Sequence, residues 1–158
     1  MRIYLTMTGM SRWAEINALW AALRHHEYIP DKIYLFKSER RSGDAKELIE
    51  CFRLLLGEYG AKNAVIEEIQ ISEGDFALSG RKVFEVLEKE KALGNEIAID
   101  ITPGRRAVIS SALMAAWKHE IDHIFYLYLD DFRKPDNPYP MIPFHFQHFV
   151  DLKKEVWR

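Results

Sequence analysis

The chain has 158 residues, 48% hydrophobic and 29% charged, which is enough to form one globular domain over residues 1–158 without a disulfide or a structural metal. The formal net charge of −2 excludes the broadly basic surface of proteins that coat duplex nucleic acid, so any nucleotide site has to be local. The single cysteine, Cys51, excludes an intramolecular disulfide. With no signal peptide and no long apolar run, we expect a cytoplasmic protein without a membrane segment.

Apolar, β-branched and aromatic runs alternate with segments of helical periodicity, a pattern typical of parallel sheets covered by helices. The strand-like runs occupy residues 2–7, 32–37, 64–71, 96–101 and 122–129. The helical segments occupy residues 12–25, 44–59 and 76–93, and a fourth follows residue 106 with Ile109, Leu113, Ala116 and Trp117 expected inward. After a proline-rich loop at residues 135–143, residues 144–157 alternate partly like a last strand.

These elements predict a three-layer Rossmann-like α/β fold with a mainly parallel sheet of five to six strands in the order 3-2-1-4-5. Glu67 and Glu68 give the third strand more charge than a central strand carries, so we expect it at the sheet edge. In this order the first and fourth strands are neighbours. Ligands of such sheets collect in the crevice between the carboxyl ends of those two strands.

The loops after the first and fourth strands share an unusual chemistry. Loop 1 contains Thr8, Gly9, Met10, Ser11 and Arg12. Loop 4 contains Asp100, Thr102, Pro103, Gly104, Arg105 and Arg106. Each loop combines a hydroxyl, a glycine and an arginine at the start of a helix, where free N–H groups and the helix dipole attract anions. We interpret the loops as a binding site for a phosphate-rich nucleotide, with Arg40 after the second strand as a further candidate contact.

A purely structural interpretation of the same residues stays open. Thr102 is a good helix cap, Pro103 fits a first helical turn, and the two arginines that follow then face solvent. Ser11 is likewise a good N-cap for the first helix. The chain has neither the Gly-x-Gly-x-x-Gly pattern of dinucleotide sites nor the P-loop pattern, which disfavours both of these nucleotide classes.

Loop 4 resembles the signature of the CRISPR-associated Rossmann-fold (CARF) domains, which is Asp or Asn, any residue, Ser or Thr, three residues, then Arg or Lys. Asp100, Thr102 and Arg106 match this signature in full. Many members have a Gly-Gly-Thr-Lys type of loop where this chain has residues 103–106, which leaves the ring size of the ligand open. The chain contains no Arg-x4-His ribonuclease motif and no room for a winged helix. We therefore expect a stand-alone sensor, a ring nuclease or one domain of a longer protein.

The resemblance implies a homodimer that binds one cyclic oligoadenylate across its two-fold axis, in type III CRISPR antiviral defence, with cyclic tetra-adenylate favoured. If the ligand is cleaved, the resemblance implies a metal-independent reaction without a cofactor. A ribose 2′-hydroxyl attacks the neighbouring phosphorus and leaves a 2′,3′-cyclic phosphate. Arg105 or Arg106 would stabilise the charged phosphorane, and Ser11 would orient the ribose and phosphate. Since arginine stays protonated and the loops offer no evident general base, binding without cleavage stays open.

A second motif supports a different hypothesis. Residues 119–123 read His119-Glu120-Ile121-Asp122-His123 and satisfy the His-Glu-x-x-His pattern of zinc proteases. That pattern requires a helix, so that both imidazoles lie one turn apart beside a carboxylate that activates water. The charged Asp122 and the strand-like residues that follow weaken the interpretation, but a zinc-dependent hydrolase is the alternative function.

Overall fold

The computed structural model describes residues 1–38, 45–72, 74–130 and 136–156. The described residues form a six-stranded sheet in the order β3-β2-β1-β4-β5-β6. The strands are β1 (Arg2–Met7), β2 (Lys32–Ser38), β3 (Val65–Ile71), β4 (Glu96–Asp100), β5 (His123–Leu129) and β6 (Gln147–Asp151). The helices are α1 (Arg12–His25), α2 (Ala45–Glu58), α3 (Phe76–Ala92), α4 (Arg106–Trp117) and α5 (Leu152–Val156). The expected strand order 3-2-1-4-5 is confirmed.

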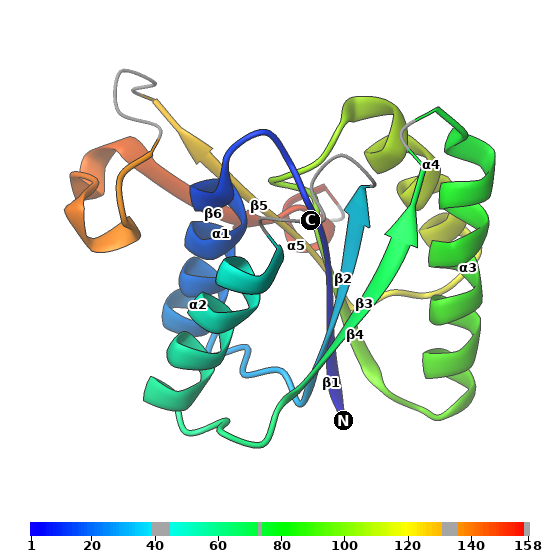
Figure 1. Cartoon of the computed structure of the whole chain (residues 1–158), viewed down its shortest axis with the longest axis horizontal. Coiled ribbons are helices and arrows are strands. Elements are labelled where there is room, and N and C mark those ends of the chain that lie inside the picture. The colour runs from blue at the N-terminus through cyan, green and yellow to red at the C-terminus, as the bar shows by residue number, and fades with distance from the viewer. Residues whose placement is uncertain (39–44, 73, 131–135, 157–158) are drawn as a thin grey trace.

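The sheet is parallel from β1 to β5 and antiparallel between β5 and β6. The carboxyl ends of the five parallel strands therefore lie along one edge of the sheet, the upper edge in Figure 1. β1 and β4 are hydrogen-bonded neighbours, with Leu5 opposite Ile99 in the register. This pairing places the residues after Met7 beside the residues after Asp100, as the sequence predicts.

Helices cover both faces of the sheet and give the molecule three layers. Figure 1 shows α1 and α2 on one side and α3 and α4 on the other. Because side chains alternate along a strand, β1 contributes to both cores. Ile3 and Leu5 belong to the core beneath α3 and α4, whereas Tyr4 belongs to the core beneath α1 and α2. The three-layer Rossmann-like prediction is confirmed.

β3 lies at the edge of the sheet, which confirms the expectation from its charge. Glu67 forms an ion pair with Lys32 of β2 at 2.6 Å, and Glu68 forms one with Lys37. The two carboxylates thus lie on an edge strand of the described sheet and pair with lysines of the adjacent strand β2. An edge strand with charged side chains resists pairing with another chain.

Two expectations are wrong. Trp117 was expected inward, but 83% of it is exposed, because α4 buries the row Val108, Ala112 and Ala116 instead. The tail is not one strand over residues 144–157, since residues Phe144–Phe146 form a 3-10 turn before the short β6, and α5 follows β6. Within the described ranges, no helix combines the length and the apolar character needed to cross a bilayer.

Candidate functional site

Loops 1 and 4 meet at two glycines. A Cβ added to Gly9 would lie 2.8 Å from the backbone nitrogen of Gly104 and 3.2 Å from the Cβ of Pro103, so the two backbones are in direct contact there. Gly104 has φ +103°, a conformation that L side chains rarely adopt, and an added Cβ would lie 3.3 Å from the Cβ of Met7. Both glycines are therefore required for the loops to approach, and the predicted juxtaposition of the loops is confirmed.

The carboxyl group of Asp100 lies beneath this contact and is fully buried. It accepts hydrogen bonds from the Thr6 hydroxyl at 2.9 Å and from the backbone N–H of Thr102 at 2.9 Å. Burial raises the pKa of Asp100 to about 6, and the hydrogen bonds from Thr102 and Thr6 oppose that rise. Asp100 thus joins β1 to the start of loop 4. A contact between Asp100 and a ligand remains a prediction from the sequence.

Thr102 fixes loop 4 against β5. Its hydroxyl oxygen accepts a hydrogen bond from the backbone N–H of Leu127 at 2.8 Å. β4 has already ended at Asp100, so the side chain of Thr102 provides an acceptor where the strand no longer does. The expected capping of α4 by Thr102 is absent, since Arg105 is the N-cap residue. The first two signature positions, Asp100 and Thr102, therefore hold the loop in shape.

Loop 1 is anchored on both sides. The Thr8 hydroxyl accepts a hydrogen bond from the backbone N–H of Ser38 at 3.1 Å, which ties the loop to β2. The Gly9 N–H donates to the Glu15 carboxylate of α1 at 2.6 Å. The Ser11 hydroxyl donates to Asp136 at 2.8 Å and makes no capping hydrogen bond to α1. These contacts fix the course of the loop from β1 into α1.

The arginines of the two loops occupy different positions. Arg12 forms an ion pair with Glu47 of α2. Arg105 is the N-cap of α4 and Arg106 is its first residue, and both are exposed. The first turn of α4 contains no acidic residue, and the Arg105 side chain makes no capping bond. The N-terminus of α4 therefore carries two guanidinium groups in addition to the positive end of its helix dipole.

Of the remaining predicted site residues, one is exposed, one is buried and one lies outside the described residues. Met10 is 82% exposed at the tip of loop 1, and Pro103 is buried beneath Gly9. Arg40 lies outside the described residues. Sequence reasoning missed Thr6, although a threonine inside an otherwise apolar strand is a signal for a buried polar partner. The structure thus brings loops 1 and 4 together and leaves Arg12 paired with α2.

The His-Glu-x-x-His segment does not have the geometry of a zinc protease. α4 ends at Trp117 and β5 begins at His123, so His119 and His123 do not lie one helical turn apart. The ring of His119 packs against Phe84 with centroids 4.7 Å apart. The two nitrogens of His123 contact Asp151 at 2.7 Å and Glu96 at 3.1 Å. No group of three or more potential ligands for a metal occurs among the described residues, so the structure does not support the zinc hypothesis.

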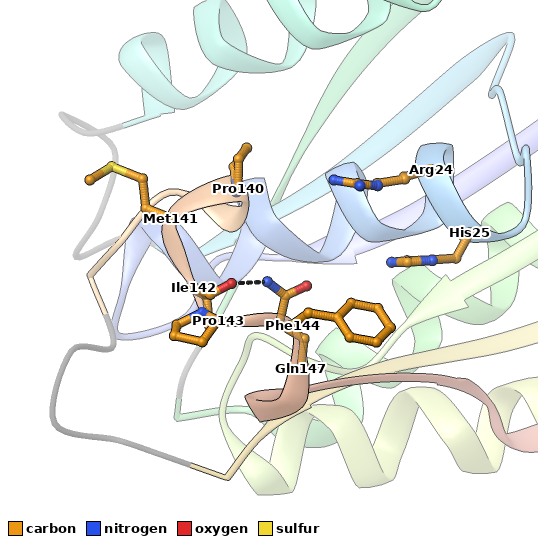
Figure 2. A pocket seen from close by; sticks show the side chains of 8 residues that line it. All are labelled: Arg24, His25, Pro140, Met141, Ile142, Pro143, Phe144 and Gln147. Atoms are coloured by element: carbon orange, nitrogen blue, oxygen red, sulfur yellow. Dashed lines mark hydrogen bonds between the residues drawn. The ribbon is translucent and has the colours of Figure 1, made fainter.

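A cavity of about 280 Å³ lies away from the two loops. Figure 2 shows its lining by Arg24 and His25 of α1 and by the segment from Pro140 to Gln147. His25 contacts the Tyr139 hydroxyl at 2.7 Å, and the Gln147 amide donates to the backbone oxygen of Ile142. Arg24 lies at the far end of α1 from Ser11, about 20 Å away at the rise of a helix. The cavity is therefore separate from the candidate site.

Comparison with known proteins supports the same fold. Neither a known protein family nor a curated protein matches the sequence. Enterococcus italicus Csm6 bound to cyclic hexa-2′-fluoro-hexa-dAMP has a TM-score of 0.62 at 20% identity, over 86% of this chain and 35% of Csm6. A type III CRISPR defence DNA nuclease activated by cyclic oligoadenylate has a TM-score of 0.61 at 14% identity, over 81% of this chain and 19% of the nuclease. Can2 from Sulfobacillus thermosulfidooxidans in complex with cyclic tetra-adenylate has a TM-score of 0.55 at 18% identity, over 82% of this chain and 32% of Can2.

These likenesses show a shared fold. The resemblance to CARF domains, inferred from Asp100, Thr102 and Arg106, is thus confirmed at the level of the fold. The chain spans between 19% and 35% of the length of the three proteins, so it corresponds to one part of each. Most of each of those proteins lies outside the region that matches this chain.

Proposed function

We propose that this chain binds a cyclic oligoadenylate, with cyclic tetra-adenylate preferred, at the carboxyl ends of β1 and β4, and opens the ring by metal-independent cleavage. The observation that carries the proposal is the contact between Gly9 and Gly104, which joins loop 1 to the arginine-bearing start of α4. Three of the solved proteins that share the fold are bound to, or activated by, molecules of this class.

The electrostatics of loop 4 suit a phosphodiester ligand. Arg105 and Arg106 provide two permanent positive charges at the start of α4, and the first turn of this helix contains no acidic residue. Guanidinium groups form paired hydrogen bonds with phosphate oxygens, and the first N–H groups of a helix also bind phosphate. Gly104 lets the backbone of the loop approach a ligand without a Cβ in the way. The net charge of the whole chain is −2, so the attraction for a phosphodiester ligand has to come from a local group of cations such as this one.

A two-fold symmetric ligand calls for a two-fold symmetric protein, and α4 offers a surface for it. Its outer face carries the row Ala107, Ser110, Met114 and Trp117, with Met114 78% and Trp117 83% exposed. Met114 and Trp117 are neighbours on this face, and adjoining apolar side chains at such exposure are a feature of interaction surfaces. We propose that α4 contacts α4 of a second copy, which would bring both copies of Arg105 to one ligand.

Calorimetric titration with cyclic tetra-adenylate, cyclic hexa-adenylate and linear tetra-adenylate tests the binding. Arg105→Gln and Arg106→Gln are each expected to weaken binding of the cyclic ligand by about 10-fold or more, since each loses a charged hydrogen bond. Arg53→Gln, an exposed arginine on α2, is the matched control and should leave the affinity unchanged. Equal affinity for all three ligands, or no effect of either loop variant, would contradict the proposal.

The mass of the protein in solution tests the dimer. Trp117→Glu is expected to shift the chain to a monomer in light scattering after size exclusion, because a charge would be buried in the interface. Leu54→Glu, at an apolar residue of α2 that is 71% exposed, is the control and should leave the dimer intact. A monomeric wild-type chain in the presence of ligand would refute the symmetric arrangement.

A further inference from the structure

One face of β5 and β6 is partly open beside α4. Ile124 pairs with Ile99 in the register and packs against the core beneath α3 and α4, so the alternate residues Tyr126 and Tyr128 point to that same side. Tyr126 is 37% and Tyr128 is 42% exposed. His148 of β6 lies opposite Tyr128 in the antiparallel register and shares this face.

A tyrosine, an aspartate and a histidine are joined at the end of this face. The Nε2 atom of His148 lies 2.6 Å from Oδ2 of Asp130, and the Tyr128 hydroxyl donates a hydrogen bond to Oδ1 of the same carboxylate. The rings of Tyr128 and His148 stack with centroids 5.2 Å apart and planes at 27°. The hydrogen bonds from Tyr128 and His148 lower the pKa of Asp130, so its carboxylate stays charged at neutral pH. We name these three residues the β5–β6 cluster.

The β5–β6 cluster lies at the same edge of the sheet as the two loops. The residue before Tyr128 is Leu127, whose N–H donates to Thr102 of loop 4 at 2.8 Å. β6 is the next strand beyond β5, so His148 lies two strand spacings from β4, about 10 Å. The Asp130 N–H donates to the backbone oxygen of Phe146, which holds the end of β5 against the start of β6. A ligand held by loop 4 therefore has to span about 10 Å to meet the β5–β6 cluster.

The proposed cleavage needs a general base that loops 1 and 4 do not provide. Arg105 and Arg106 stay protonated and cannot accept a proton. Asp100 is fully buried and is engaged with Thr6 and Thr102. Histidine is the side chain best suited to take up a proton near neutral pH, and an imidazole oriented by a carboxylate is the usual form of such a base.

We propose that His148 is the general base for ring opening, an inference that rests on the proposed function. Asp130 holds Nε2, and Nδ1 takes the proton from a ribose 2′-hydroxyl. The 2′-oxygen forms a bond to the neighbouring phosphorus as the bond from phosphorus to the 5′-oxygen breaks. The 5′-oxygen takes a proton from water, and the hydroxide that remains takes the proton from Nδ1 of His148. The product ends in a 2′,3′-cyclic phosphate and a 5′-hydroxyl. Asp130 and Tyr128 are positioning residues, and the arginines of loop 4 stabilise the phosphorane.

Single-turnover cleavage of labelled cyclic tetra-adenylate in the presence of a chelator tests this role, together with the calorimetric affinity for the same ligand. His148→Asn is expected to lower the cleavage rate by about 100-fold or more while the affinity stays within about twofold of wild type. His145→Asn replaces a neighbouring exposed histidine and should change neither quantity. The variants are compared by circular dichroism to establish that all of them fold.

The pH dependence of the rate separates a chemical role from a structural one. The wild-type rate should rise with pH and level off, and His148→Asn should lose this step, whereas His145→Asn keeps it. Asp130→Asn should lower the cleavage rate, because the imidazole of His148 loses the carboxylate that orients it. A wild-type chain that binds the ring without opening it, or a His148→Asn variant that cleaves at the wild-type rate, would overturn the role of His148 and leave the binding site standing. Absence of binding by the wild type would overturn both proposals.

Discussion

Replacing Asp100 with asparagine removes a carboxyl group whose pKa burial raises from 3.8 to about 6. The folded chain holds the Asp100 proton more tightly than the unfolded chain does. This group therefore contributes stability that is fully present below pH 3.8 and is lost as the pH rises through about 6. Between pH 8 and pH 5 the contribution amounts to about 1.4 kcal/mol, since one pKa unit corresponds to about 1.4 kcal/mol.

Urea unfolding of wild type and Asp100→Asn at pH 8 and at pH 5 measures this contribution. On going from pH 8 to pH 5, the free energy of unfolding of the wild type should gain about 1.4 kcal/mol relative to that of the variant. Other groups that titrate in this range, His25 and His26 among them, are common to both chains and cancel in the comparison. A difference in overall stability between the two chains does not affect the result, because the comparison is between the changes in their free energies of unfolding from pH 8 to pH 5.

Parallel pH dependences for the two chains would refute the reasoning. An independent measurement is the NMR chemical shift of the Asp100 carboxyl carbon in the wild-type protein as a function of pH. This shift should titrate with a midpoint of about 6. A midpoint near the ordinary value for aspartate would mean that water reaches the carboxyl group. The hydrogen bonds from Thr6 and Thr102 would then belong to an exposed site.

Substitutions at Gly9 and at Thr102 test the contact between the two loops and the bond that holds loop 4 to β5. Gly9→Ala should lower the free energy of unfolding by about 1–3 kcal/mol and weaken ligand binding, because its Cβ would lie 2.8 Å from the Gly104 nitrogen. Gly57→Ala, with no atom within 4 Å of the added Cβ inside α2, should instead stabilise by about 0.5–1 kcal/mol in the same denaturation assay, and equal effects would contradict the contact. Thr102→Val leaves the Leu127 N–H without its acceptor and should cost about 1–3 kcal/mol, which Thr102→Ser should largely restore unless the hydroxyl is unimportant.

The sequence predicts the order of the elements well because the central strands β1, β2 and β4 are buried on both faces and each connection between parallel strands contains a helix. Glu67 and Glu68 also place β3 correctly, since a central strand has no room for two charges. The position of loops 1 and 4 follows from the strand order alone. These predictions depend on periodicity and burial, which are local properties of the chain.

Other features depend on which neighbour an element meets. α4 is apolar on most of its surface, so periodicity alone does not determine that Ala112 faces the sheet and Trp117 faces solvent. The antiparallel β6 follows a proline-rich segment and has five residues, too few for a clear alternation. The β5–β6 cluster joins Asp130 to His148 across an interval of 18 residues, and the sequence shows no spacing pattern that would link them.

The hydrogen bond between Thr102 and Leu127 holds loop 4 to β5, and the proposed ligand-binding segment follows it. The framework of the domain ends at this threonine, and residues 103–106 extend beyond it. A designer could therefore graft a different tetrapeptide between Thr102 and the second residue of α4 and keep the scaffold. Libraries that vary residues 103, 105 and 106 and keep Gly104 would show whether a single scaffold can be adapted to anionic ligands of different size.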